Sequence, residues 1–282
     1  MKLLRHGPAG AEKPGLLDTD GTIRDLSAVI PDLAGEALSP AGLDRLRALD
    51  PATLPAVAPG TRLGPPVSGM RNFVCIGLNY ADHAAETGAP IPKEPIIFLK
   101  SLGALQGPND DVVIPKGSSK TDWEVELAVI IGTRAKNVAV HDALSHVAGF
   151  AVSNDVSERS WQSERGGTWD KGKGADTFGP LGPWLVTADE VPDPQDLSLF
   201  LEVDGQRRQD GSTSTMIFGV QHLVSYVSHF ITLHPGDVIS TGTPPGVGMG
   251  LKPPVFLRPG QTMRLGIAGL GEQQQRVVAY EE

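Results

Sequence analysis

The chain has 282 residues, of which 40% are apolar and 20% charged, and its formal net charge is −9. A chain of this length can bury a large core, and the composition is ordinary for a globular protein. The acidic balance and the lack of a Lys/Arg cluster exclude a nucleic-acid binder and a protein held to an anionic membrane surface.

No apolar run approaches the roughly 20 residues that a membrane-spanning helix needs. The first ten residues are not followed by the apolar stretch of a secretory signal. The single cysteine, Cys75, allows no disulfide within the chain, which fits a reducing compartment. We therefore expect a cytoplasmic protein in which Cys75 is a buried, small apolar side chain.

The N-terminal part is predicted to be a small α+β domain, residues 1–66, that ends in a proline-rich connector. Apolar pairs flank the tetrapeptide Asp-Thr-Asp-Gly at residues 18–21, which is typical of a hairpin turn. Ser39 and Pro40 suit the N-cap and first position of a helix that extends to about residue 49. Five prolines in residues 50–68 indicate an extended connector, and we place the domain boundary there.

The second domain, residues 67–282, is predicted to be mainly β. Short apolar runs between turn residues predict strands at 72–76, 96–99, 112–114, 123–131, 150–153, 184–186, 199–203, 238–240, 262–267 and 276–280. One helix is expected over residues 220–231, where apolar residues recur at helical spacing, and it should cover a sheet.

Two glutamates at alternating positions begin the longest predicted strand. Strand residues i and i+2 point to the same face, so Glu124 and Glu126 lie side by side on the face that Ala128 and Ile130 continue. Because the other face is apolar as well, the strand is expected to be buried. Two neighbouring ionised carboxylates in a buried strand need a cation or a shared proton. If the strand end is exposed, both glutamates simply face water.

Asp155 follows a second predicted buried strand, and its position has two interpretations. It can cap a helix over residues 156–162, or it can join the two glutamates as a metal ligand. Three carboxylates with open coordination positions suit Mg²⁺ or Mn²⁺, and also Ca²⁺. Zinc is disfavoured, because the sequence has neither a Cys cluster nor a His pair at ligand spacing.

A candidate general base follows the first strand of the second domain. His83 and Glu86 are three residues apart in a short helical stretch, so they can meet on one helix face. A histidine oriented by a carboxylate is a competent base for water. The alternative is an ion pair on a surface helix.

Three further segments carry candidate substrate-binding side chains. Lys173 and Thr177 lie in a Gly-rich loop, where the lysine either binds a carboxylate or enolate or is solvated. Arg159 and Gln162, one helical turn apart, either bind a substrate carboxylate or face solvent. Thr243 lies in a Gly-rich loop without a dinucleotide-binding or Walker A pattern, and we expect this loop to meet a small anion.

From about residue 71 to the C-terminus, six blocks in fixed order resemble the fumarylacetoacetate hydrolase family. They are Gly77-x-Asn79-Tyr80-x-x-His83-x-x-Glu86, Pro95-x-x-Phe98-Leu99-Lys100, Asp122-x-Glu124-x-Glu126-Leu127, Asn154-Asp155-x-x-x-Arg159-x-x-Gln162, Lys173-x-x-x-Thr177-x-Gly179-Pro180 and Thr241-Gly242-Thr243-Pro244-x-Gly246-Val247-Gly248. The resemblance implies a mainly β fold with α+β additions, a mixed β-sandwich or roll, and a homodimer. One departure is Ser157-Glu158, where Thr-Ala is common in the family, and it leaves Glu158 without an assigned role.

The resemblance also implies roles for individual residues. The ligands of a metal ion, Mg²⁺ with Mn²⁺ as the alternative, would be Glu124, Glu126 and Asp155. The catalytic residues would be the water-activating pair on a mobile lid and an enolate-stabilising lysine, namely His83, Glu86 and Lys173. The residues near the substrate would be Tyr80, Lys100, Arg159, Gln162, Thr177 and Thr243.

The first 65 residues resemble the bacterial branch that hydrolyses 2,4-dioxo-3-deoxy-L-rhamnonate or L-fuconate, some members of which are labelled ureidoglycolate lyase. The expected reaction is metal-dependent hydrolysis of a C–C bond in a small anionic 2,4-dioxo acid, giving pyruvate and a hydroxy acid such as lactate. Three alternatives are a decarboxylase of the oxaloacetate type, an isomerase or hydratase of unsaturated dioxo acids, and a metal-stabilised binding protein.

Overall fold

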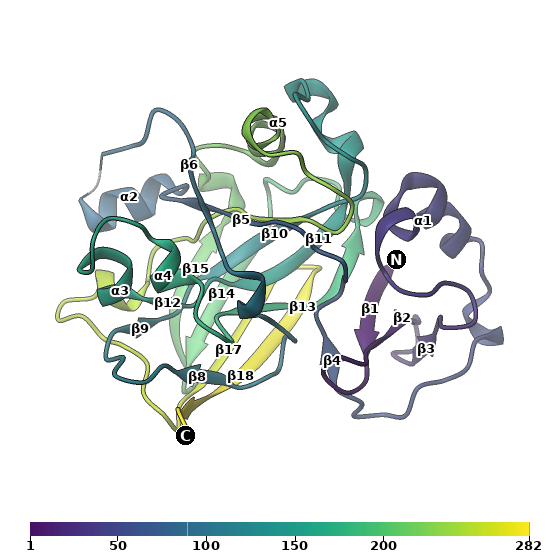
Figure 1. Cartoon of the computed structure of the whole chain (residues 1–282), viewed down its shortest axis with the longest axis horizontal. Coiled ribbons are helices and arrows are strands. Elements are labelled where there is room, and N and C mark those ends of the chain that lie inside the picture. The colour runs from purple at the N-terminus through teal and green to yellow at the C-terminus, as the bar shows by residue number, and fades with distance from the viewer. Residues whose placement is uncertain (89, 282) are drawn as a thin grey trace.

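The computed structural model describes residues 1–88 and 90–281, without the side chains of residues 83, 85 and 87. Two β-sheets and a covering helix form the main body, and the N-terminal residues form a smaller unit at one side of it (Figure 1). Within the described residues, no helix combines the length and the apolar character needed to cross a bilayer.

The larger sheet contains segments from both predicted domains. Its strands are β1 (Lys2–His6), β2 (Lys13–Leu17), β3 (Ile23–Asp25), β4 (Leu63–Gly64), β5 (Phe73–Gly77), β6 (Ile96–Leu99), β7 (Leu105–Gln106), β10 (Val125–Ile131), β11 (Val147–Asn154), β13 (Gly179–Thr187) and β16 (Val238–Ser240). Their order is β3-β2-β1-β13-β11-β10-β16-β5-β6, with β4 paired to β1 and β7 to β13. The pairs β5–β16 and β7–β13 are parallel, which makes the sheet mixed.

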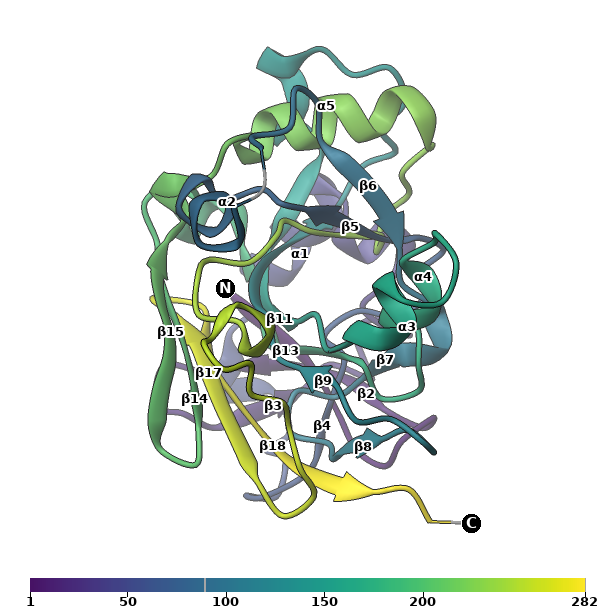
Figure 2. The same ribbon diagram turned by 90° about the vertical axis from the view of Figure 1, so that its left-hand side faces the viewer.

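The second sheet has the order β15-β14-β17-β18-β8. Its strands are β8 (Val112–Ile114), β14 (Ser198–Val203), β15 (Gln206–Ser212), β17 (Thr262–Ile267) and β18 (Gly271–Ala279). A short ribbon joins β9 (Thr121–Asp122) to β12 (Ser157–Glu158). The α-helices are α1 (Pro40–Arg47), α2 (Ala81–Thr87), α3 (Arg159–Ser163), α4 (Asp170–Lys173) and α5 (Val220–Phe230). Figure 2 shows α5 lying across the end of the molecule that contains β5.

The predicted elements are confirmed, several of them with longer bounds. Every predicted strand overlaps an observed one, and the predicted 184–186 strand is part of the nine-residue β13. The hairpin turn at residues 18–21 connects β2 to β3. Ser39 caps α1, because its hydroxyl accepts a hydrogen bond from Gly42 N at 3.0 Å. The short strands β7, β9 and β12 are too brief to leave a period-two signal in the sequence.

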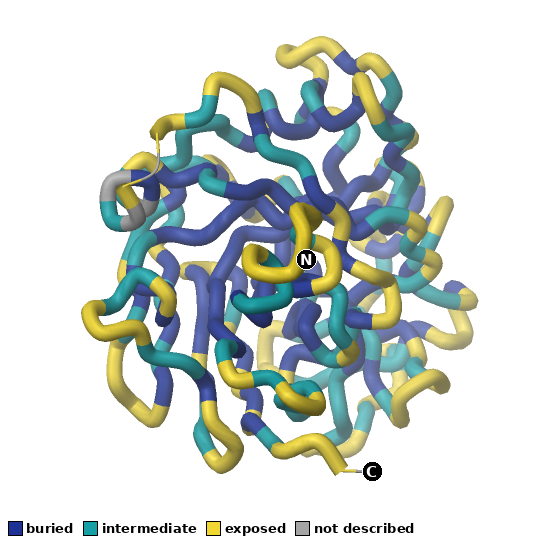
Figure 3. Tube along the Cα trace, turned by 60° about the vertical axis from the view of Figure 1, so that its left-hand side comes forward, coloured by how far each residue is buried: buried dark blue, intermediate teal, exposed yellow. Residues whose placement is uncertain are grey.

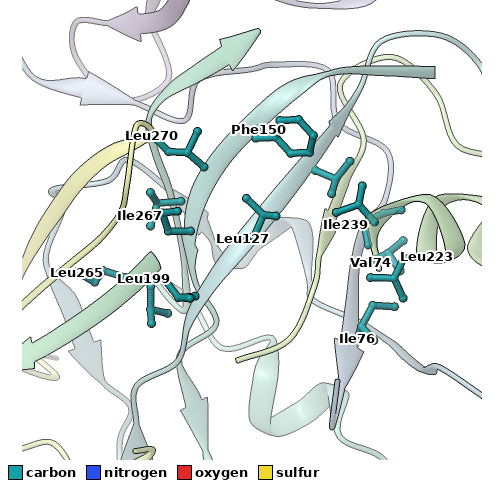
Figure 4. Close-up of a cluster of buried hydrophobic side chains, with 14 of the residues drawn as sticks. Val74, Ile76, Leu127, Phe150, Leu199, Leu223, Ile239, Leu265, Ile267 and Leu270 are labelled. Carbon is teal, nitrogen blue, oxygen red and sulfur yellow. The ribbon is translucent and has the colours of Figure 1, made fainter. Parts of the chain in front are cut away.

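The two faces of β10 belong to two different cores, as the period-two pattern predicts. Val125, Leu127 and Val129 join the core between the two sheets, which α5 closes with Leu223 and neighbouring side chains. Figure 4 shows Leu127 between side chains of the second sheet and side chains of the α5 side. Ala128 on the opposite face belongs to the core shared with the N-terminal unit. Figure 3 shows that the interior segments are buried almost continuously.

The N-terminal unit extends the larger sheet. β1 pairs with β13 in an antiparallel register that places Leu3 opposite Leu185, and Leu3 and Leu26 are buried in one cluster with Ala128. Pairing between residues so far apart has no local sequence signal. The division of the chain at residue 66 stays a prediction.

Candidate metal centre and active site

Three buried carboxylates meet at the N-terminal end of β10. Glu124 and Glu126 lie on one face, and Asp155 follows the paired strand β11, where its N–H donates to Glu124 O at 2.9 Å. One carboxylate oxygen from each residue lies within 4.8 Å of the others, and no residue of this triad is more than 5% exposed. The alternative of an exposed strand end is therefore wrong.

Three cationic side chains contact this carboxylate triad. Lys173 Nζ lies 2.7 Å from Glu124 Oε2 and 2.8 Å from Asp155 Oδ2. Lys100 Nζ lies 2.6 Å from Asp155 Oδ1, and Arg159 Nη2 lies 2.7 Å from Glu124 Oε1. Burial opposes the charged form of Lys173, but the carboxylates of Asp155 and Glu124 outweigh it and raise the pKa of this lysine above its ordinary value. Lys173 is therefore a buried cation and not a solvated loop residue.

Glu126 is held differently, because its described hydrogen-bond donors are neutral. Its Oε2 accepts hydrogen bonds from Ser240 Oγ at 2.6 Å and from Gly242 N at 2.9 Å. Burial and the negative charges of Asp155 and Glu124 raise the pKa of the Glu126 carboxyl well above its ordinary value. Additional positive charge beside Glu126 would remove this conflict.

The donor set fits a hard divalent cation. When Asp122 is included, which pairs with Arg159, the described cluster has four carboxylates and three cationic side chains. Carboxylate oxygens that converge from separate strands are the ligands that Mg²⁺ and Mn²⁺ prefer. Glu124, Glu126 and Asp155 would hold such an ion, and its charge would compensate the surplus carboxylate.

Asp122 organises the rim of the site and is a residue that the sequence reasoning did not assign. Its carboxylate accepts hydrogen bonds from Arg159 Nε at 2.8 Å, Gly248 N at 2.7 Å and Met249 N at 2.9 Å. It therefore fixes Arg159 and the turn at 248–250 relative to the triad. The alternation of Asp122 with the two glutamates is the signal that could have identified it.

Glu158 acquires a structural role as the N-cap of α3. Its carboxylate accepts hydrogen bonds from Ser160 N at 3.2 Å, Lys120 N at 3.0 Å and the Ser118 hydroxyl. Burial opposes ionisation, but the hydrogen bonds from Ser118 and Ser160 outweigh it and lower the pKa of Glu158. Because Glu158 caps this helix, the alternative that Asp155 does so is wrong.

Arg159 and Thr243 contribute side chains whose polar groups are already engaged. Arg159 Nη1 donates to Gln162 Oε1 at 3.1 Å, and Arg159 is only 4% exposed, which excludes the surface interpretation for it. Thr243 Oγ1 donates to Val125 O at 2.9 Å and accepts from Gln209 Nε2 at 2.8 Å.

Helix α2 starts beside the loop that follows β16. Asn79 anchors its start, because Asn79 Nδ2 donates to Thr241 O at 2.8 Å. Gly246 N donates to the two carboxylate oxygens of Glu86 at 3.1 and 3.2 Å, which ties the helix to this loop. The side chain of His83 lies outside the described residues, so its pairing with Glu86 stays a prediction.

A cavity of about 260 Å³ opens beside the triad. It is lined by Ile76, Gly77, Leu78, Phe98, Glu124, Glu126, Arg159, Gln162, Ser163, Trp169, Lys173, Thr243 and Met249. Six of the predicted site residues therefore meet at one cavity. Its volume lies below the roughly 300–1,000 Å³ typical of pockets for drug-sized ligands, so it suits a small molecule.

Three predicted substrate-binding residues lie outside the described cavity lining. Lys100 Nζ lies behind the triad, where it also donates to Val156 O at 3.0 Å. Thr177 Oγ1 accepts a hydrogen bond from Val113 N at 2.9 Å. Tyr80 is buried, and its hydroxyl has no hydrogen-bond partner among the described residues. Burial and the charge of Glu126 raise the pKa of Tyr80.

Sequence comparison detects one family over most of the chain. The pattern of the fumarylacetoacetate (FAA) hydrolase C-terminal family matches residues 72–278. A relative from Burkholderia ambifaria, which is provisionally named a hydrolase, is 67% identical over 276 residues, covering 98% of each chain.

Solved structures of similar fold cover the whole chain and differ in their named activities. The fumarylacetoacetate hydrolase of Exiguobacterium antarcticum has a TM-score of 0.86 and 35% identity, covering 99% of this chain and 100% of that one. A maleylpyruvate hydrolase from Sphingobium sp. SYK-6, solved with a manganese(II) ion and pyruvate, has a TM-score of 0.82 and 29% identity, with full coverage of both chains. A 2-hydroxyhepta-2,4-diene-1,7-dioate isomerase from Mycobacterium marinum has a TM-score of 0.75 and 33% identity, again with full coverage.

Proposed function

Because the chain belongs to the fumarylacetoacetate hydrolase family, we propose that it is a metal-dependent hydrolase that cleaves a C–C bond of a small 2,4-dioxo acid and releases pyruvate. The observation that carries this proposal is the buried triad of Glu124, Glu126 and Asp155, with Lys173 across it, at the wall of a small cavity. Mg²⁺ is the proposed ion and Mn²⁺ the alternative. The manganese ion and pyruvate in the maleylpyruvate hydrolase support both the ion class and the product.

The chain's own residues supply the charges and proton transfers of this reaction. When bound, the divalent ion would act as a Lewis acid toward the 2-oxo acid end of the substrate. Lys173 keeps its positive charge because the neighbouring carboxylates raise its pKa, and its ammonium group is placed to stabilise negative charge that develops on that end. His83, oriented by Glu86, is proposed to take a proton from the attacking water.

The atoms balance in a single hydrolysis. The water oxygen forms a bond to C4, and the C3–C4 bond then breaks with its electron pair moving to C3. A proton taken up at C3 completes pyruvate, and the former C4 carbonyl leaves as a carboxylic acid. The resemblance of the first 65 residues supports a 2,4-dioxo-3-deoxy sugar acid as substrate and a hydroxy acid such as lactate as this second product. A homodimer is proposed on the same resemblance.

A pyruvate-release screen over 2,4-dioxo acids with Mg²⁺ or Mn²⁺ tests the proposal. The wild type should release pyruvate, and His83→Ala should lose turnover by about 100-fold or more while calorimetry shows unchanged metal binding. His141→Ala is the matched control, because the side chain of His141 is 82% exposed. Absence of pyruvate from every dioxo acid would overturn the proposed hydrolysis.

Isomerisation of unsaturated dioxo acids is a second candidate, supported by relatives of 33% identity that are named as isomerases. It would shift the ultraviolet spectrum of an unsaturated dioxo acid without releasing pyruvate. Decarboxylation of oxaloacetate releases pyruvate but needs no water-derived nucleophile, so His83→Ala would retain it. The same screen therefore separates the three reactions.

A further inference from the structure

One wall of the cavity is formed by apolar side chains, namely Ile76, Leu78, Phe98, Trp169 and Met249. Resting on the proposed function, we infer that this wall receives the acyl group of the substrate and that this group is apolar. The preferred substrate is then an alkyl- or aryl-substituted acylpyruvate. A polyhydroxylated sugar acid, or a dioxo acid with a second carboxylate, is disfavoured.

The aromatic part of this wall adjoins the charged groups of the site. The rings of Phe98 and Trp169 meet edge to face, with centroids 5.4 Å apart and an interplanar angle of 62°. The Trp169 ring lies over Gly77, where a Cβ atom would come within 2.4 Å of it, so the indole occupies space that only glycine leaves open. Lys173 Nζ lies 5.1 Å from the centroid of the Phe98 ring. Because Lys173 also contacts the triad, a ligand held there in so small a cavity extends along this aromatic corner.

Leu78 completes the wall from a backbone conformation that is unusual for leucine. Its φ is +50°, in the left-handed region that glycine and asparagine adopt more readily than residues with bulky side chains. Leu78 lies between the buried β5 and Asn79, whose side chain is fixed by hydrogen bonds, so the surroundings determine its conformation. A strained residue that lines a cavity indicates a role for its side chain there. We assign Leu78 as a specificity-determining residue for the acyl group.

The polar groups of the described lining leave little to match a hydroxylated acyl chain. Gln162 Oε1 accepts from Arg159, and Ser163 Oγ donates to Arg159 O at 2.9 Å. The Thr243 hydroxyl is engaged as both donor and acceptor. The cations in the described lining, Lys173 and Arg159, are paired with carboxylates. Added hydroxyl groups would lose their hydration without gaining partners, and a second carboxylate would meet no uncommitted described cation.

Substrates with different acyl groups test this inference directly. We would measure kcat/KM for 2,4-dioxopentanoate, 2,4-dioxohexanoate and 2,4-dioxoheptanoate, and for a heptanoate analogue hydroxylated at C5 and C6. The alkyl series should rise about fourfold per added methylene until the cavity is full, which corresponds to about 0.8 kcal/mol for each buried CH₂. The hydroxylated analogue should react about 10- to 100-fold more slowly than its alkyl counterpart. Equal or faster turnover of the hydroxylated analogue would overturn the inference.

Binding of 2-oxo acids keeps this test separate from that of the proposed function. Competition calorimetry with 2-oxoheptanoate and its hydroxylated analogue should give the same order of affinities whether or not any C–C bond is cleaved. Alkyl preference without pyruvate release would support the inference and overturn the hydrolysis. Pyruvate release with a preference for the hydroxylated acid would support the hydrolysis and overturn the inference.

Leu78→Gly tests the assigned specificity residue. Glycine adopts the observed φ more easily, so the variant should remain folded, and Asn137→Gly is the matched control at φ +54° outside the described cavity lining. Leu78→Gly should lower kcat/KM for 2,4-dioxoheptanoate about tenfold and change that for 2,4-dioxopentanoate less than threefold. Asn137→Gly should change neither. An unaltered chain-length preference in Leu78→Gly would remove Leu78 from the assignment.

Discussion

Buried carboxylates lie at both ends of β10, and their surroundings differ. At the C-terminal end, Asp237 precedes β16 beside Ile131. Its two oxygens accept hydrogen bonds from Arg71 N at 2.7 Å, Asn72 N at 2.9 Å, Asn72 Nδ2 at 2.8 Å and His234 N at 2.8 Å. All four donors are neutral N–H groups, so this carboxylate is satisfied by the chain itself and holds two segments together.

At the N-terminal end, Glu126 has neutral donors from Ser240 and Gly242, but two further carboxylates lie within 4.8 Å. Repulsion between these like charges is what raises the pKa of Glu126 beyond the effect of burial. Both carboxylates are buried, so burial alone does not distinguish a binding site from a structural clamp. The accumulation of like charge does, because it favours the binding of a cation.

The largest expected effect is on turnover at the N-terminal end. Glu126→Gln keeps the shape of the side chain but removes a proposed metal ligand, so kcat/KM for pyruvate release should fall at least about 100-fold. Without metal, the variant should unfold at the same temperature as the wild type or a higher one, because one of three adjacent negative charges is gone. Calorimetric melting in a chelator and a coupled pyruvate assay measure the two effects. Turnover within threefold of the wild type would contradict the assignment.

The isosteric change at the other end, Asp237→Asn, should reverse this result. The amide must turn an NH₂ group toward two N–H donors, which leaves hydrogen bonds unmade and should lower the free energy of unfolding by about 2–3 kcal/mol. Turnover per folded molecule should stay within twofold of the wild type. Urea unfolding and initial rates well below the melting temperature test both expectations. A loss of turnover at unchanged stability would show that the two ends of β10 do not divide in this way.

The smallest expected effect concerns Glu158, a third buried carboxylate, which is hydrogen-bonded like Asp237. Glu158→Ala removes the N-cap of α3 and should cost roughly 1 kcal/mol at neutral pH. Because hydrogen bonds lower the pKa of Glu158 in the folded state, its contribution to stability is present above the ordinary pKa of glutamate. That contribution is lost as the pH falls through the lowered value. Urea unfolding at several pH values should show the difference between wild type and variant shrinking in acid, and a growing difference would contradict the account.

The pattern of β10 shows how far the sequence predicts this site. Period-two alternation places Glu124 and Glu126 on one face, and the two separate cores confirm it. Asp155 was open to two interpretations, because the side chains that decide between them are distant in sequence. Lys100 is 55 residues before Asp155 in the chain, and its ion pair depends on how β6 and β11 are placed in one sheet.

The apolar wall of the cavity was not predicted for a similar reason. Phe98 and Trp169 are ordinary apolar residues in the sequence, and only the fold brings their rings together over Gly77. The positive φ of Leu78 likewise has no local signal, since leucine rarely adopts it. In contrast, Asp122 continued a visible alternation and could have been assigned from the sequence.

Metal binding at the N-terminal end of β10 is the central claim, and titration calorimetry with Mn²⁺ and Mg²⁺ tests it most directly. Wild type and Asp237→Asn should bind one ion per chain with the same affinity, whereas Glu126→Gln should bind it at least about tenfold more weakly. Binding of equal affinity and stoichiometry by all three proteins would contradict the claim that Glu124, Glu126 and Asp155 form the metal site.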